Sequence, residues 1–162
     1  MTTLQRCSDH LYWTELSCAD GSVYPLDWRD VPDRGLAVGR MFEDVRAECT
    51  ILCVELHGSA PLRGVCLTIA SGYRSPQYQA YLRTIPRLKA AKHSQHCEGR
   101  AIDIACPREL GMGEFETAVR RATAREGSPI RYVEFRPSMY YIHVDNWSRY
   151  ADAAKVKWET IA

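Results

Sequence analysis

Three side chains able to bind a metal ion lie in two short stretches of the sequence. The stretch "SQHCEGRAIDIA", residues 94–105, holds His96 and Asp103, and "YIHVD", residues 141–145, holds His143. Two imidazoles and a carboxylate, with water in the fourth position, form the open geometry of catalytic zinc. Such an ion lowers the pKa of its water to about 7 and polarises a carbonyl, so that hydroxide attacks an amide at neutral pH.

Each of these residues also has an ordinary structural interpretation. A lone histidine at a strand end is most often a surface residue or a satisfied core residue. An aspartate that comes after a turn often accepts hydrogen bonds from loop amides. The combination of all three is what indicates a metal site.

Two predicted strands position the ligand-type side chains. Residues 101–106 alternate in polarity, which places Asp103 on the face opposite Ile102 and Ile104. In residues 139–147, His143 shares a face with Tyr141 and Asp145, opposite Ile142 and Val144. If the two strands are neighbours, His96, just before the turn at Glu98-Gly99, can join Asp103 and His143.

The remaining pattern predicts a mixture of helices and strands within one domain spanning residues 1–162. Apolar residues at helical spacing predict helices over 36–56, with Gly58 as the stop, and over about 114–126. Ser75-Pro76 reads as an N-cap and first helical position, so a third helix runs from 76 to about 84. Strands are expected at 65–69 and 130–135, and a loop at 86–100.

Composition excludes several classes of partner. Lysine and arginine total 21 against 20 acidic residues, so no basic field is present to attract nucleic acid. No run approaches the ~18 apolar residues of a membrane span, and the N-terminus lacks the features of a secretory signal. We therefore expect a protein made in the cytoplasm without a signal peptide, for which any export needs another route.

Seven cysteines form an odd set, which argues against a disulfide framework in a reducing compartment. Cys49 and Cys53 are four residues apart in a helical pattern, a spacing that can ligate metal. No second cysteine pair stands at zinc-finger distance, so a cysteine zinc site is disfavoured. We interpret most of the cysteines as small buried apolar residues.

Three blocks together resemble the zinc D-Ala-D-Ala carboxypeptidases and related peptidoglycan endopeptidases. They are "SGYRS" at 71–75, "SQHCEGRAIDI", which matches Ser-x-His-x-x-Gly-x-Ala-x-Asp, and "YIHVD", which matches His-x-Asp. With the similar entry segment "YWTELSCADG" at 12–21, the resemblance covers roughly residues 10–150. It implies the α+β fold shared with hedgehog domains: a small antiparallel sheet with helices packed on one side.

The resemblance also implies roles for individual residues. The family's zinc ligands fall on His96, Asp103 and His143, and the arginine that binds substrate and stabilises the oxyanion falls on Arg74, whose other interpretation is a structural residue tying down a loop. Ser94 and Gln95 flank the first ligand and are candidates for orienting it or contacting substrate. Gly99 is interpreted as a tight-turn residue that lets Asp103 reach the ion.

The sequence leaves the general base open. Many relatives have an acidic residue three positions before the last histidine, where this chain has Tyr140. We favour Asp145, which shares the ligand face of its strand and can take a proton from the zinc water, although orienting a ligand histidine is an equally natural role for it. Glu134 can reach the site from the preceding strand, and His93 is a third candidate. Tyr140 and Trp147 are candidates for the edge of the site, with Tyr140 also a possible substrate contact.

The leading functional hypothesis is a monomeric zinc peptidase that cuts a D-amino-acid-containing amide in a peptidoglycan stem peptide or cross-link. The sequence does not choose between carboxypeptidase and endopeptidase. A phage lysin, a virion or prophage component, or a bacterial cell-wall enzyme all suit this expectation. The alternative, favoured by Tyr140, is a zinc-stabilised binding or structural module of the same fold without turnover.

Overall fold

The centre of the computed structural model, which describes residues 5–88, 90–147 and 156–161, is a five-stranded sheet. The strands lie in the order β3-β4-β6-β5-β7, and their bounds are β3 (Thr68–Ser71), β4 (Ala101–Ala105), β5 (Tyr132–Arg136), β6 (Tyr141–Asp145) and β7 (Lys157–Thr160). All neighbours are antiparallel except β5 and β7, which are parallel. The predicted α+β class is therefore confirmed.

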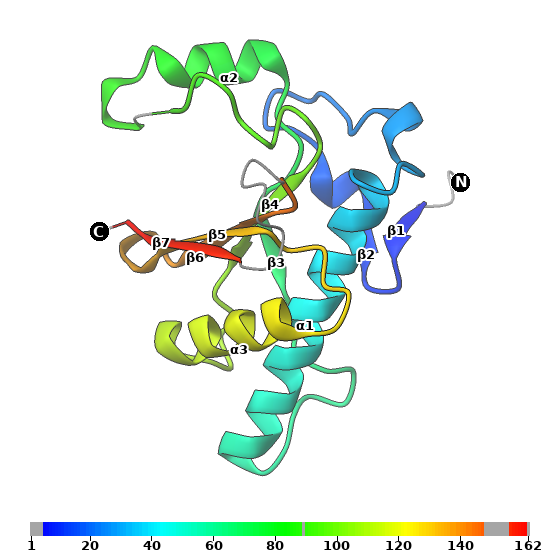
Figure 1. Ribbon diagram of the computed structural model, residues 1–162, viewed down its shortest axis with the longest axis vertical. Coiled ribbons are helices and arrows are strands. Elements are labelled where there is room, and N and C mark those ends of the chain that lie inside the picture. Colours follow the sequence, from blue (N-terminus) through cyan, green and yellow to red (C-terminus); the bar gives the residue numbers. More distant parts are fainter. Residues whose placement is uncertain (1–4, 89, 148–155, 162) are drawn as a thin grey trace.

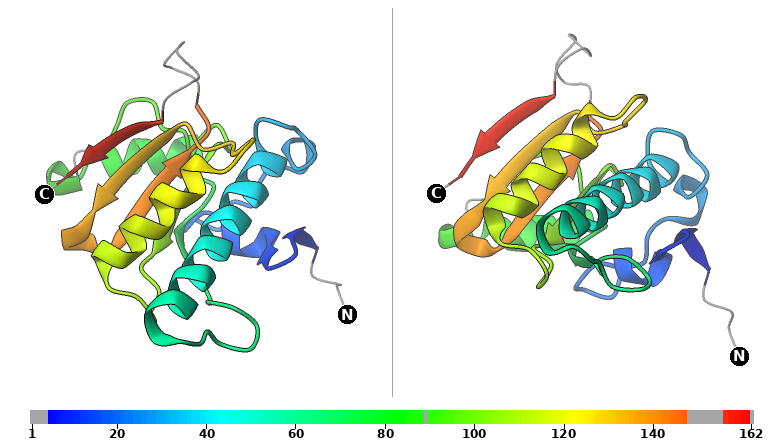
Figure 2. Two further views of the ribbon diagram at one scale, coloured as in Figure 1. Left: turned by 60° about the horizontal axis from the view of Figure 1, so that its bottom comes forward. Right: turned by 90° about the horizontal axis from the view of Figure 1, so that it is seen from below.

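Two of the three helices cover one face of this sheet. The helices are α1 (Gly35–His57), α2 (Pro76–Arg83) and α3 (Met112–Ala124). Figure 2 shows α1 and α3 side by side, with α3 in front of the strands, so the predicted packing of helices on one face holds for these two. Figure 1 shows α2 on the opposite side, beyond the sheet from α1 and α3.

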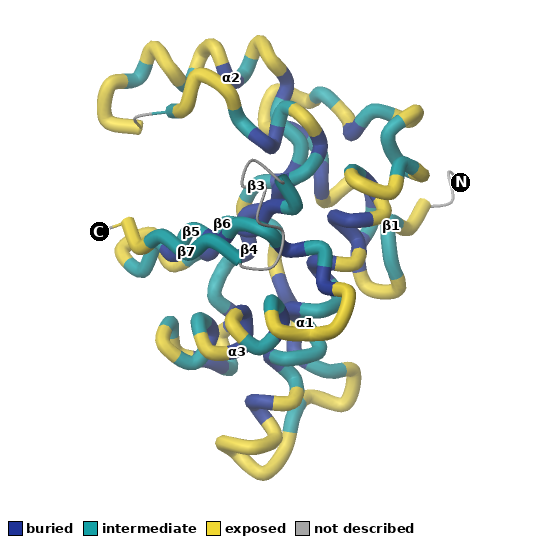
Figure 3. The backbone as a smooth tube through the Cα atoms, in the orientation of Figure 1, coloured by how far each residue is buried: buried dark blue, intermediate teal, exposed yellow. Residues whose placement is uncertain are grey.

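The core lies between the sheet and the pair α1 and α3. The side chains of β4, β5 and β6 that face these helices are buried and apolar: Phe135 and the fully buried Ile102, Ile104, Val133, Ile142 and Val144. Helix α1 contributes a stripe that includes Val38, Met41 and Val45, all at 0% exposure. Figure 3 shows this buried layer in the strands, whereas α2 and the far end of α1 are largely exposed.

The ends of the helices are set by local chemistry. The Ser75 hydroxyl accepts a hydrogen bond from the Tyr78 amide at 3.0 Å, so α2 begins at Pro76 as predicted. Gly58 ends α1 in the left-handed conformation, at φ 73°. Helix α3 begins two residues before the predicted position, because the Glu114 carboxylate accepts the Gly111 amide at 2.7 Å and caps that turn.

Strand β3 differs from its prediction. The pattern predicts a strand from residue 65, but β3 begins at Thr68, which pairs with Ala105, the last residue of β4. Because β4 ends at Ala105, the residues before Thr68 have no residue of β4 opposite them with which to form strand hydrogen bonds. The Val65 amide instead donates to the Thr50 hydroxyl of α1 at 3.0 Å, so this residue is buried without being in the sheet.

Short elements near the ends of the chain lie outside the sequence prediction. A hairpin of β1 (Arg6–Ser8) and β2 (Leu11–Tyr12) packs beside α1, and β7 extends the sheet at the far edge. The 3-10 turns are Trp13–Leu16, Leu26–Trp28, Pro86–Leu88 and Pro137–Met139. None of the helices in the described part of the chain is long and apolar enough to cross a membrane.

Candidate metal centre and its cavity

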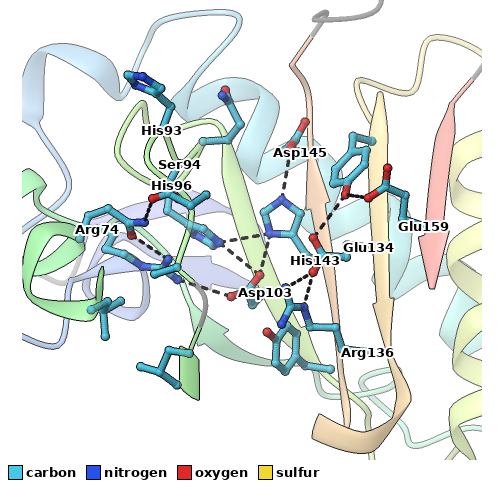
Figure 4. A pocket seen from close by; sticks show the side chains of 18 of the residues that line it. Arg74, His93, Ser94, His96, Asp103, Glu134, Arg136, His143, Asp145 and Glu159 are labelled. Atoms are coloured by element: carbon cyan, nitrogen blue, oxygen red, sulfur yellow. Dashed lines mark hydrogen bonds and ion pairs between the residues drawn. The ribbon is translucent and has the colours of Figure 1, made fainter. Parts of the chain in front are cut away.

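His96, Asp103 and His143 meet at one point above the sheet (Figure 4). His96 Nε2 lies 3.2 Å from Asp103 Oδ1 and 3.2 Å from His143 Nδ1, and the last two atoms are 2.8 Å apart. Ligand atoms ~2.0 Å from a tetrahedral zinc ion are separated by ~3.3 Å. The three atoms are therefore spaced like one slightly contracted face of such a tetrahedron, and they could hold a metal ion.

The strand register brings Asp103 and His143 together. The two residues are direct partners in the antiparallel pairing of β4 with β6, and Glu134 pairs with His143 from β5. Their side chains leave the sheet on the face away from α1 and α3, which we call the site face. This arrangement confirms that the two predicted strands are neighbours with the metal-capable residues on one side.

His96 reaches the same point from the loop before β4. The turn after it requires Gly99, which has φ 66° and no side chain to place in a tight space. A Cβ atom at Gly99 would lie 2.7 Å from the Tyr24 hydroxyl oxygen and 2.8 Å from the Trp28 ring. The Tyr24 hydroxyl donates to the Gly99 carbonyl at 2.6 Å, so the turn is fixed from both sides.

Both histidines are held through the ring nitrogen that faces away from the shared point. His96 Nδ1 lies 2.6 Å from the Gly72 carbonyl oxygen, and His143 Nε2 lies 3.1 Å from Asp145 Oδ2. These acceptors place the N–H on the outer nitrogen, because a carbonyl or carboxylate cannot donate. The inner nitrogens of the neutral rings therefore present lone pairs, the arrangement found in metal-binding histidines.

Gly72 is packed too tightly for any other residue. A Cβ atom on it would lie 2.5 Å from the Leu16 backbone, and the neighbouring Tyr73 amide donates to the Leu16 carbonyl at 2.7 Å. The entry segment around Leu16 thus fixes the carbonyl that orients His96.

The three convergent acceptors require a positive charge between them. Burial opposes the charge on His143, but hydrogen bonds to Asp103 and Asp145 and their negative charges outweigh it and raise the pKa to about 10. Burial likewise raises the pKa of Asp103, yet the neighbouring histidines outweigh it and hold that pKa well below its usual range. Without a metal, a proton on His143 occupies the place of the cation.

Arg74 lies beside the triad with its guanidinium fixed. Nη1 donates to Gln79 Oε1 at 3.0 Å, Nη2 donates to the Ser71 hydroxyl at 3.0 Å, and Nη2 lies 3.8 Å from Asp103 Oδ2. The Gln79 amide in turn donates to the Ala91 carbonyl at 2.7 Å. The second carboxylate oxygen of Asp103 therefore faces Arg74 while the first faces the histidines.

The candidate bases differ in their surroundings. Asp145 is 3% exposed, and its Oδ1 accepts the Trp147 amide at 2.9 Å while Oδ2 contacts His143. Glu134 lines the cavity on the site face and is paired with Arg136, and the Tyr132 hydroxyl lies 3.3 Å away. The exposed His93 ring points away from the triad in Figure 4.

A cavity of about 570 Å³ opens above the triad, within the range of ligand sites. Ser94, Gln95 and Trp147 line it, as expected for residues beside the ligands. Tyr140 lines neither this cavity nor the adjoining one, and it is 69% exposed. Its φ of 56° ends a 3-10 turn, so strand β6 begins at Tyr141, which faces the cavity in its place.

Several residues of the cavity are not identified by the sequence pattern. Gln79 carries no local signal, because its role depends on α2 lying across from the sheet. Tyr132 donates to Glu159 of β7 at 2.7 Å on the site face. The alternation Lys157, Trp158, Glu159 is a strand signal that could have placed β7 and Glu159.

The cysteines take no part in this centre. All seven are free thiols, and Cys49 and Cys53 are buried in the core. Among the described residues, His96, Asp103 and His143 form the group of ligand-type side chains close enough to hold an ion.

Comparisons of the chain with protein-family models, with curated proteins and with solved structures find no match. The functional proposal therefore rests on the motifs and on the geometry of the site.

Proposed function

We propose that this protein is a zinc metallopeptidase that hydrolyses a D-amino-acid-containing amide bond in peptidoglycan. The observation that carries the proposal is the convergence of His96 Nε2, Asp103 Oδ1 and His143 Nδ1, with both outer ring nitrogens already bonded. Two imidazoles and one carboxylate with an open side suit catalytic zinc. The motif resemblance supplies the substrate class.

A zinc ion in this position supplies an activated water molecule and a Lewis acid for the amide carbonyl. The chain's own residues supply orientation and charge. Arg74 presents a fixed guanidinium beside the ligands, which suits either a terminal carboxylate or the negative charge that develops on the carbonyl oxygen. Its bonds to Gln79 and Ser71 fix that orientation before substrate binds.

The two candidate carboxylates divide into two roles in this proposal. Asp145 is a positioning residue, because its side chain is buried and its Oδ2 atom accepts the outer N–H of His143. Glu134 lines the cavity from β5 and is the strand partner of His143, so its carboxylate lies on the site face beside the triad (Figure 4). Glu134 is therefore the carboxylate that takes the proton from the attacking water.

Digestion of purified peptidoglycan with zinc-loaded protein, with mass spectrometry of the fragments, tests the proposal. We expect new amine and carboxyl ends at one bond that involves a D-amino acid. The fragment masses distinguish loss of a terminal residue from cleavage inside a stem or cross-link. The matched His143→Ala protein should release nothing, and equal fragments from both proteins would reject the assignment.

One observation favours a second candidate, a zinc-stabilised binding module. The position three residues before His143 holds Tyr140, an exposed residue outside the cavity, where many relatives have an acid. A protein that binds one zinc ion and adheres to peptidoglycan without releasing fragments would be this module.

A further inference from the structure

The cavity above the triad adjoins a second one of about 690 Å³. The two share the segment His93–Gln95, together with Gln79 of α2 and Trp147. A ligand that spans both cavities therefore passes directly over Gln95, next to the ligand His96. The second cavity is lined mainly by α2 and by residues 92–100, so the two cavities together form a groove that extends from the triad along α2.

The positive charges that line the two cavities are either paired with carboxylates or unpaired, and Arg74 and Arg100 belong to the paired group through Asp103 and Asp33. On the site face, Arg136 is paired with Glu134 and Lys157 with Glu159. Arg87 lines the first cavity, Arg83 and Lys92 line the second, and all three are exposed. None of these three has an ion-pair partner in the part of the chain that the structure describes. We call Arg83, Arg87 and Lys92 the cationic wall.

The acidic residues of the groove do not neutralise the cationic wall. Asp103 and Asp145 both contact His143 of the triad. Arg100 of the second cavity pairs with Asp33 at 2.5 Å. Glu98 is the remaining acidic residue there, against Arg83 and Lys92. An unpaired guanidinium or ammonium beside a concave surface attracts and binds an anionic group.

A buried acceptor in the middle of the groove points to a second feature of the ligand. Gln95 is 9% exposed, and its Oε1 atom is buried without a hydrogen-bond partner among the described residues. Because this Oε1 atom has almost no exposed surface, a ligand N–H reaches it only when the Gln95 side chain turns toward the groove that it lines, and the bond formed there removes an unfavourable unpaired acceptor. A chain of amide groups carries such donors.

We propose that the cationic wall binds a carboxylate of an acidic peptide that lies along both cavities, with one of its amide N–H groups on Gln95. This inference rests on the proposed function and names its substrate class: a stem peptide whose free carboxylate lies on the α2 side of the cleaved bond. The cationic wall then sets the choice between acidic and amidated peptides, while the triad sets the reaction.

The test uses one soluble peptidoglycan stem peptide in two forms, with free side carboxylates and with the same carboxylates amidated. Dissociation constants for the zinc-loaded protein are measured by calorimetry at ~50 and ~500 mM NaCl, and cleavage rates are measured separately. We expect the acidic form to bind about tenfold more tightly at low salt, with most of that preference lost at high salt.

Charge-removing variants locate the effect. Arg87→Gln and Lys92→Gln should each reduce the preference for the acidic form about three- to tenfold and leave zinc content unchanged. Arg63→Gln is the matched control, because it removes a positive charge that is also exposed but lies in the loop after α1, outside both cavities. Its preference should equal that of the wild type.

The outcomes separate this inference from the proposed function. Binding that prefers the acidic peptide without any cleavage would support the cationic wall and reject the peptidase. Equal binding and equal cleavage of the two forms would support the peptidase and overturn the cationic wall. The cationic wall would also be overturned if neither form of the peptide bound. The same holds if Arg63→Gln lost as much of the preference for the acidic form as Arg87→Gln and Lys92→Gln.

Discussion

Replacing Asp145 by asparagine distinguishes a general base from a residue that orients His143. Both carboxylate oxygens accept N–H groups, one from His143 Nε2 at 3.1 Å and one from the Trp147 amide at 2.9 Å. An asparagine side chain has only one oxygen, so its NH₂ group must face one of these donors. If it faces His143, the ring must place its proton on Nδ1, the atom that would bind the metal.

The Asp145→Asn side chain can accept from His143 Nε2 or from the Trp147 amide but not from both, and this loss sets the size of the expected change in zinc affinity. Loss of one buried hydrogen bond costs about 1–3 kcal/mol, and loss of the residue that fixes the ligand tautomer weakens metal binding about 10- to 100-fold. We therefore expect the zinc dissociation constant of Asp145→Asn to rise about 10- to 100-fold, equivalent to about 1.4–2.7 kcal/mol. Turnover should recover when excess zinc is added.

Competition with a chromophoric chelator measures the zinc affinity, and Glu134→Gln is the companion variant. In our proposal Glu134→Gln keeps its zinc and loses turnover by roughly 10²-fold or more. Asp145→Asn with wild-type zinc affinity and a comparably reduced turnover rate would refute the reasoning and make Asp145 the base.

The remaining predictions concern the ligands, Arg74, the charge of His143 and the turn that supports the site. His96→Ala, Asp103→Ala and His143→Ala should each lose zinc by elemental analysis, and full occupancy in any one removes that residue from the ligand set. Arg74→Lys should retain zinc but lose turnover about 10- to 100-fold, since an ammonium cannot reproduce the bonds of the guanidinium fork; unchanged turnover would make Arg74 structural. Because the pKa of His143 is raised from 6.5 to about 10, zinc must displace its proton, so apparent zinc affinity should rise about tenfold per pH unit from about pH 7 to 9. By the same linkage, the free energy of unfolding of the metal-free protein should fall as the pH rises from about 6.5 to 10, and a stability that is flat over this range would contradict the pKa. Gly99→Ala should lower the free energy of unfolding by about 1–3 kcal/mol in denaturant titration, whereas Gly113→Ala, in α3 with open space around it, should raise it by about 0.5–1 kcal/mol.

The sequence predicts those parts of the fold and site that depend on local patterns. Alternation in residues 101–105 and 141–145 predicts the correct faces, because in each strand the aliphatic side chains pack toward the helices and the site residues lie on the opposite face, which in β4 is buried as well. The cap at Ser75 and the stop at Gly58 are predicted for the same reason, since the chemistry of a helix end lies within a few residues.

The features that depend on distant contacts could not be predicted in this way. The start of β3 is decided by the length of β4, and the environment of Tyr140 by the turn before β6. Whether Asp145 orients a histidine or accepts a proton depends on the Trp147 amide and on burial, not on residue spacing. The partnership of Arg74 with Gln79 likewise requires knowledge of where α2 lies.

The pairing of Asp103 with His143 ties the metal site to the assembly of the sheet. Successive residues of each strand point to opposite faces of the sheet. If β4 slid against β6 by one residue, an isoleucine of β4 would take the place of Asp103 beside His143 on the site face. Such a misaligned sheet would bury a carboxylate and an imidazole among aliphatic side chains and could not hold the ion. A metal ion that bound these residues would therefore favour the native strand register over the shifted ones.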